Sequence, residues 1–238
     1  MNTIPILMYH NIGTPPEGAR LRGLYVRRNS FARQMRLLRW LGFQGLSMSA
    51  AMPYLRGEKQ GRVAVITLDD GYLDTYENAL PVLRDNGFSA TCYFVSQRMG
   101  QSNDWDAVAL KVSKALMTES QVREWHAAGM EVGAHSRTHP RLTTCDDAQL
   151  QQELAGSKTD LEALIGAPVT QFCYPYGDYD ARVAAAAQQA GYAAATVTGR
   201  GRARPGDDPM QLKRVLVTGS NMLHLFALKL LTGYEDGR

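Results

Sequence analysis

Short apolar runs alternate along the chain with longer segments whose apolar residues recur every three or four positions. Runs of the first kind predict buried strands, and segments of the second kind predict amphipathic helices. We expect strands at 4–12, 63–68, 89–96, 130–134, 169–174, 192–198 and 212–218. Strand and helix alternate for about seven rounds, a pattern typical of a parallel α/β domain.

Capping residues indicate where several of the helices begin and end. Ser30 is expected to begin a helix, and Gly87 to end one that covers 75–86. Thr118 with Gln121 forms a capping box for a helix that stops at Gly129. Further helices are expected at 147–165, 180–190 and 221–231. In the last of these, we expect the inward-facing residues to be Leu223, Phe226, Ala227 and Leu230.

Length and composition fit one domain that covers residues 1–238. The chain is 45% hydrophobic, which is enough for one sizeable core, and it contains no internal repeat or interdomain linker. A formal charge of +3 gives no argument for a nucleic-acid partner. No apolar run is long enough to span a bilayer, so no transmembrane segment is expected. Nothing in the pattern predicts an oligomeric state.

The first residues and the cysteines bear on the compartment. The segment MNTIPILMYH lacks a basic lead and a long apolar stretch before small residues, so it predicts a first strand and no signal peptide. The three cysteines are widely spaced, which suits a reducing compartment without a disulfide framework. We therefore expect a cytoplasmic protein.

The segment 20–39 contains seven arginines and no acidic residue. On a helix these side chains would form a solvated face. The alternative is that they form a binding site for an anionic substrate or for phospholipid headgroups. Binding to headgroups would bring the protein into peripheral contact with a membrane.

Two adjacent carboxylates follow the apolar run 63–68. Asp69 and Asp70 stand where a buried strand opens into a loop, and as neighbours they cannot point the same way. One can bind a cation while the other faces a reacting molecule. An ordinary turn with a helix cap would use the same residue types. Polar groups gather at the ends of several predicted strands, which favours a barrel over an open sheet.

A pair of histidines follows the predicted strand 130–134. His135 and His139 are four residues apart, which allows both imidazoles to reach one ion. Two imidazoles and one carboxylate leave coordination positions open for water, as catalytic metal sites do.

These motifs together resemble those of the polysaccharide deacetylases, carbohydrate esterase family four. Residues 67–71, TLDDG, are similar to the first motif of the family, and 135–139, HSRTH, match the second. Residues 174–177, YPYG, resemble the third, while 7–12 and 103–106 resemble the branch that deacetylates poly-N-acetylglucosamine during export. The resemblance implies a distorted (β/α)₇ barrel that removes N-acetyl groups from N-acetylated sugars or polysaccharide.

The resemblance also implies roles for particular residues. The metal ligands would be Asp70, His135 and His139, holding zinc in the first place, with cobalt, nickel or iron(II) as alternatives. Asp69 would be the general base that accepts a proton from water. A backbone N–H near Tyr176 would help to stabilise the oxyanion.

The general acid has two candidates. The branch resemblance implies His10, at the end of the first predicted strand, whereas many relatives use a C-terminal Leu-x-His that His224 matches superficially. Cys173 stands where many relatives carry an arginine that pairs with the base. From its position on the last predicted strand, Arg214 is the residue expected to supply that charge instead.

Two other functions remain open at this stage. The first is an amidase or deformylase acting on a lipid-linked or other non-polymeric N-acyl sugar. The second is a carbohydrate-binding relative without catalysis. Such a protein would be expected to lack one or more of Asp69, Asp70, His135 and His139, and all four are present here.

Overall fold

Seven parallel strands form a closed ring in the computed structural model, which describes residues 3–236. The ring runs in the order β1, β8, β7, β6, β5, β4 and β3, and pairing of β3 with β1 closes it. Its strands are β1 (Ile6–Tyr9), β3 (Val63–Leu68), β4 (Thr91–Phe94), β5 (Glu131–Ala134), β6 (Gln171–Cys173), β7 (Ala194–Arg200) and β8 (Leu212–Leu216). The predicted (β/α)₇ barrel is therefore confirmed.

The first strand closes the ring because it pairs on both sides. Its four residues Ile6–Tyr9 lie in register with Val65–Leu68 of β3. On its other edge, Leu7 and Met8 pair with Val215 and Leu216 of β8. Every residue of β1 and β3 is buried, as expected of strands covered on both faces.

An eighth strand, β2 (Gln44–Leu46), lies outside this ring. It pairs with residues 63–65 of β3, whereas β4 pairs with residues 67–68 of the same strand. The following helix α2 (Met48–Leu55) is capped by Ser47, whose hydroxyl accepts a hydrogen bond from the N–H of Ala50. The sequence analysis did not predict this strand and helix.

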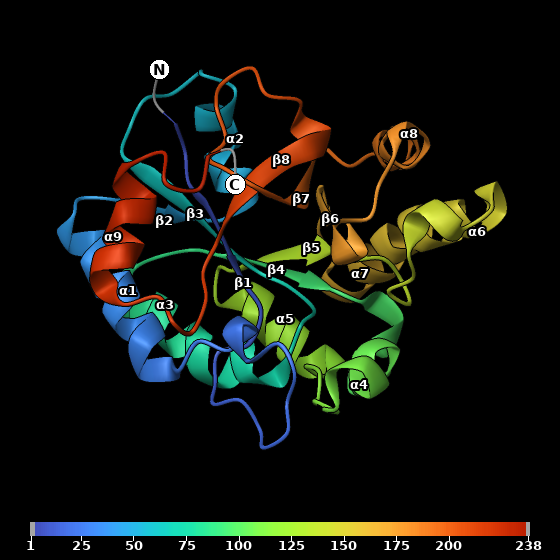
Figure 1. Cartoon of the computed structure of the whole chain (residues 1–238). Helices are drawn as coiled ribbons and strands as arrows, with labels where there is room; N and C mark the ends of the chain where they lie inside the picture. The colour runs from blue at the N-terminus through green and yellow to red at the C-terminus, as the bar shows by residue number, and fades with distance from the viewer. Residues whose placement is uncertain (1–2, 237–238) are drawn as a thin grey trace.

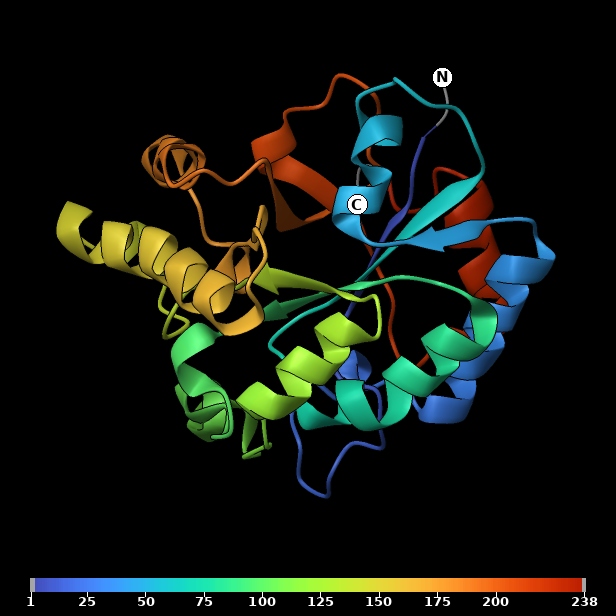
Figure 2. The ribbon, with the colours of Figure 1, turned by 180° about the vertical axis from the view of Figure 1, so that it is seen from behind.

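Helices surround the barrel on its outside, as Figure 1 and the reverse view in Figure 2 show. Besides α2, they are α1 (Arg28–Trp40), α3 (Leu80–Asn86), α4 (Asp104–Leu110), α5 (Glu119–Ala127), α6 (Asp147–Gln151), α7 (Ser157–Ile165), α8 (Ala181–Gln189) and α9 (Leu223–Leu231). Two π-helical turns extend them, Thr75–Ala79 before α3 and Gln152–Gly156 between α6 and α7.

Several predicted helix ends are confirmed and two expectations are wrong. Gly87 ends α3 with a φ of 66°, and Thr118 and Gln121 form the expected capping box. Ser30, however, lies inside α1, which begins at Arg28 because Arg27 already has the extended backbone of a cap. Leu223 does not face the core, since it is exposed at the first position of α9, while Phe226 and Leu230 are buried as expected.

Within residues 3–236, no helix is long and apolar enough to cross a membrane, as expected. The cytoplasmic location stays a prediction.

Candidate active site at the carboxyl ends of the strands

The two carboxylates after β3 separate because the chain turns sharply between them. The N–H of Asp69 still donates to the carbonyl of Tyr9 at 3.0 Å, which continues the pairing of β1 with β3. Asp70 then adopts a left-handed φ of 74°, and Gly71 follows with 72°. A left-handed backbone is costly for a residue other than glycine and is often found at functional sites. Both carboxylates are almost completely buried.

The turn directs Asp70 toward the two histidines of the second motif. Its Oδ1 lies 3.3 Å from Nε2 of His135 and 3.4 Å from Nε2 of His139. Burial raises the pKa of Asp70, but hydrogen bonds from His135 and His139 lower it by more and leave it well below its usual range. The predicted triad is thus brought together, and all three residues are buried.

The distances from Asp70 to the two histidines fit a tetrahedral zinc ion. Two ligand atoms that are each about 2.1 Å from such an ion lie about 3.4 Å apart. The Nδ1 atom of His135 faces the carbonyl of Cys173 at 2.6 Å, and because a carbonyl only accepts, Nδ1 must carry the hydrogen. This contact fixes the ring so that Nε2 faces Asp70, as outer hydrogen bonds commonly do for histidine ligands.

His139 is held by aromatic rings on two sides. Trp105 stacks on it with the ring centroids 4.7 Å apart, and Tyr176 meets it edge-on at 4.6 Å. The indole therefore packs one face on a candidate ligand. Burial lowers the pKa of His139, which favours the neutral imidazole that a metal ion requires.

Two acidic residues outside the motifs fix the loop between the histidines. Glu153 accepts hydrogen bonds from the N–H groups of Arg137 and Thr138 at 2.7 and 2.9 Å. Asp160 binds the guanidinium of Arg137 through two contacts of 2.9 and 2.8 Å. Neither residue was predicted to serve the site.

Asp69 pairs with an arginine that is completely buried. Arg214 of β8 donates to both oxygens of Asp69 at 2.7 and 2.8 Å. Its remaining donors reach the carbonyl of Val197, the hydroxyl of Thr67 and the sulfur of Cys173. Burial raises the pKa of Asp69, but the charge of Arg214, followed by that of His10, lowers it by more. Asp69 is therefore ionised at neutral pH.

Of the two candidates for the general acid, only His10 is part of this arrangement. Its Nε2 lies 3.7 Å from Oδ2 of Asp69, and its side chain borders the same cavity as the triad. His224 is exposed on the outer helix α9 and does not border that cavity.

The segment after His10 is fixed by a cluster whose charged members, Lys114 and Asp74, are half-buried. The ammonium of Lys114 donates to the side chain of Asn11 at 2.6 Å and also binds Asp74. Asp74 in turn accepts from the N–H of Ile12, and the rings of Tyr25 and Tyr72 lie 5.0 Å from the ammonium. Sequence analysis did not assign this cluster.

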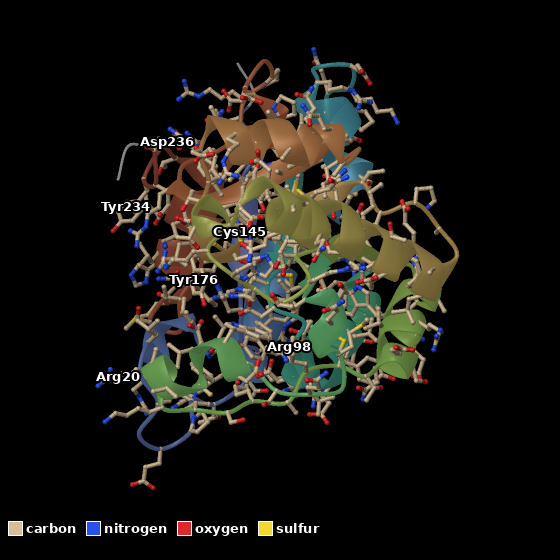
Figure 3. The ribbon with its side chains drawn as sticks, turned by 90° about the vertical axis from the view of Figure 1, so that its right-hand side faces the viewer. Arg20, Arg98, Cys145, Tyr176, Tyr234 and Asp236 are labelled. Carbon is tan, nitrogen blue, oxygen red and sulfur yellow. The ribbon has the colours of Figure 1, made fainter. Side chains whose placement is uncertain are left out.

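The triad, Asp69 and His10 line one cavity of about 140 Å³. Tyr176 also borders it, with a left-handed φ of 60° and a hydroxyl that donates to Asp106 at 3.2 Å. Arg20 and Leu21 contribute to the rim from the segment before α1, a contribution that the motifs did not indicate. Figure 3 places Tyr176 and Arg20 on the same side of the molecule.

Parallel α/β barrels that are enzymes have their active sites at the carboxyl ends of the strands, where the buried carboxylates and histidines of this protein lie. Residues 56–195 match the family model described as "Polysaccharide deacetylase". The Bacillus subtilis (strain 168) protein YxkH, named "Putative polysaccharide deacetylase", is 31% identical over 217 residues, which cover 90% of this chain and 71% of that protein. The chain belongs to the polysaccharide deacetylase family.

Solved structures agree with this assignment. A polysaccharide deacetylase from Bacillus cereus is 26% identical with a TM-score of 0.81, and the alignment covers 96% of this chain and 69% of that one. The structure of IcaB from Ammonifex degensii is similar in fold, with a TM-score of 0.81 at 22% identity and 98% coverage of both chains.

Proposed function

We propose that this protein is a metal-dependent hydrolase that removes N-acetyl groups from N-acetylated sugars or polysaccharide, releasing acetate and a free amine. One observation supports the proposal most strongly. The candidate ligands Asp70, His135 and His139, a carboxylate held by Arg214, and His10 all border a single cavity. Family membership supports the deacetylase class.

The donor set would hold one divalent ion, with zinc preferred and cobalt, nickel or iron(II) as alternatives. When bound, such an ion lowers the pKa of a water molecule and polarises the carbonyl of the substrate. Asp70 would supply the negative charge, and the imidazoles of His135 and His139 would supply nitrogen donors whose orientation is set by Cys173, Trp105 and Tyr176.

Asp69 would act as the general base. It is ionised and lies at the edge of the cavity, so it can accept a proton from water as the water oxygen attacks the amide carbon. Arg214 would orient both carboxylate oxygens without competing for the proton, because a guanidinium stays protonated.

His10 would complete the reaction as the general acid. The carbon–nitrogen bond breaks only when the nitrogen receives a proton, since an amide anion is a poor leaving group. The imidazole of His10, whose Nε2 lies 3.7 Å from Asp69, would donate that proton. The backbone N–H of Tyr176, in the left-handed turn that borders the cavity, is the proposed second donor to the oxyanion.

The test measures acetate release from N-acetylglucosamine oligomers and from nucleotide- and lipid-linked N-acyl sugars. Each substrate is assayed with the purified protein, after chelation, and after zinc is restored. We expect release from at least one acetylated sugar, loss on chelation and recovery with zinc. Formate release from a lipid-linked sugar alone would indicate the amidase alternative. Saturable sugar binding without any release would indicate a binding protein.

A further inference from the structure

The outward side of α1 is a row of arginines without carboxylate partners. Within residues 3–236, none of its five exposed arginines forms an ion pair with an acidic residue. They are Arg27, at the cap, and Arg28, Arg33, Arg36 and Arg39. Arginines elsewhere, such as Arg137 and Arg202, do pair with aspartates. The charges of α1 therefore remain available to an external anion.

Apart from the exposed His224, the outward side of α9 is apolar, which is the reverse of an ordinary surface helix. Its only lysine, Lys229, points inward, where it is 5% exposed and its ammonium pairs with the buried Glu235 at 2.7 Å. The solvent instead meets large apolar side chains, with Met222 69%, Leu223 38%, Leu228 40% and Leu231 45% exposed. Leu228 and Leu231 lie within one turn of each other on this side.

The two helices lie side by side. Contacts join α1 to α9, and the views from the front and from behind both place α9 beside α1 (Figures 1 and 2). Trp40, at the end of α1, is 80% exposed. One face of the protein, called the α1–α9 face from here on, thus combines unpaired arginines with exposed leucines, a methionine and a tryptophan.

We propose that the α1–α9 face docks on a lipid bilayer that contains anionic phospholipids. The arginines would bind the phosphate groups, and the side chains of α9 and Trp40 would enter the boundary between headgroups and acyl chains. Basic residues beside exposed apolar ones are the combination that binds helices to the surface of anionic membranes. An apolar patch of this kind on a protein otherwise exposed to water marks an interaction site.

Charge argues against a second copy of the chain as the occupant. A twofold dimer sets the same surface against itself, so the arginines of both copies would enter one interface. The face contains no carboxylate that could meet them, because 20–39 holds no acidic residue and Lys229 is the only charged residue of α9. An anionic bilayer supplies the missing negative charge.

The test is co-sedimentation of the full chain with vesicles. One set contains phosphatidylcholine with phosphatidylglycerol, and the other contains phosphatidylcholine alone. We expect binding to the first set only, weakened by added salt. Arg28→Gln/Arg33→Gln/Arg36→Gln should reduce the binding constant about a hundredfold, at about fivefold per arginine. Leu228→Ser/Leu231→Ser should reduce it at least about tenfold, since these side chains would leave the acyl boundary.

Matched control variants remove arginine or apolar side chains from other parts of the surface. Arg56→Gln/Arg123→Gln/Arg204→Gln removes three arginines that have carboxylate partners, and Val108→Ser removes an apolar side chain that is 91% exposed on α4. Both should bind like the parent, and every variant should keep its melting temperature.

Three outcomes would overturn the proposal. They are absence of binding to anionic vesicles, equal binding to both vesicle sets, and equal losses in the matched variants. Light scattering after size exclusion tests the second copy as occupant. A dimer that dissociates in Leu228→Ser/Leu231→Ser, together with no vesicle binding, would assign the face to self-association.

Discussion

Arg214 and Asp69 form a buried, two-contact ion pair between β8 and the end of β3, although 145 residues separate them in the chain. The sulfur of Cys173 lies 3.3 Å from the Arg214 guanidinium. The positive charge that pairs with Asp69 thus comes from Arg214 on β8 and not from position 173 on β6.

Replacing Arg214 with methionine should destabilise the protein and change its pH dependence. Removal of one partner of a buried ion pair costs about 3–5 kcal/mol. Because Arg214 holds the pKa of Asp69 below its unfolded value, the pair stabilises the parent above about pH 4, and this contribution is lost as the pH falls through the folded pKa.

The gap in unfolding free energy between parent and Arg214→Met should therefore narrow as the pH falls below about 4. The acid limb of kcat/KM should move to higher pH, because Asp69 would stay buried without its counter-charge. Urea unfolding across pH measures the first effect and a pH–rate profile the second. A profile equal to that of the parent would contradict a role for Arg214 in the ionisation of Asp69. Arg56→Gln, which removes only the surface pair with Glu58, should leave the free energy of unfolding nearly unchanged.

Asp69→Asn should abolish most turnover while leaving metal binding intact. The amide keeps the shape of the carboxylate but cannot accept the proton, so kcat should fall by about 10²–10⁴-fold. Steady-state kinetics and metal analysis of the same sample check both parts. If kcat remained near that of the parent, Asp69 would be a structural partner of Arg214 only.

Removing any one member of the triad should weaken metal binding by at least tenfold while the barrel still folds. The variants are Asp70→Ala, His135→Ala and His139→Ala, and each deletes one of three protein ligands. Metal content after dialysis against a competing chelator gives the result, and His224→Ala is the matched control. Full metal content in all three variants would refute the ligand assignment.

His10→Ala should lower kcat by about 10²–10⁴-fold and remove the alkaline limb of the pH–rate profile. His224→Ala should stay within a few-fold of the parent, because His224 lies on the outside of the barrel. Metal content should be unchanged in both. The reverse pattern would return the acid to the C-terminal motif.

Lys114→Met should impair turnover, although Lys114 itself would not contact the substrate. Loss of the ammonium leaves Asp74 without its cation and Asn11 without its donor, so the segment that follows His10 loses its anchor. We expect kcat to fall about tenfold or more, with KM and metal content nearly unchanged. Lys111→Met removes a nearby exposed lysine and should behave like the parent. Equal losses in both variants would exclude this positioning role.

The parts of the site that could be predicted from the sequence are those encoded within a few residues. Asp70 follows its strand directly, and His135 and His139 share one loop, so the spacing alone brought them together as candidates. Arg214 could be expected from its place on the last strand, which ends at the same edge of the barrel.

The supporting contacts could not be predicted because they join distant parts of the chain. Lys114 and Asn11 are 103 residues apart, and Asp160 reaches Arg137 across 23 residues. β2 was missed because it contains three residues, one of them a glycine, and so carries almost no apolar pattern. Leu223 was misplaced because a helix of leucines gives little indication of which side meets the core.

The way β1 closes the ring has a consequence for the order of events during synthesis. β1 is made first but pairs only with β3 and β8, and the partner residues in β8 are 215 and 216. The ring therefore cannot close before residue 216 has been synthesised, and pairing between such distant segments is slow. The candidate general acid and general base both lie where β1 pairs with β3, His10 after β1 and Asp69 after β3. Arg214 is synthesised after Asp70, His135 and His139, so Asp69 gains its buried counter-charge only when β8 joins the ring.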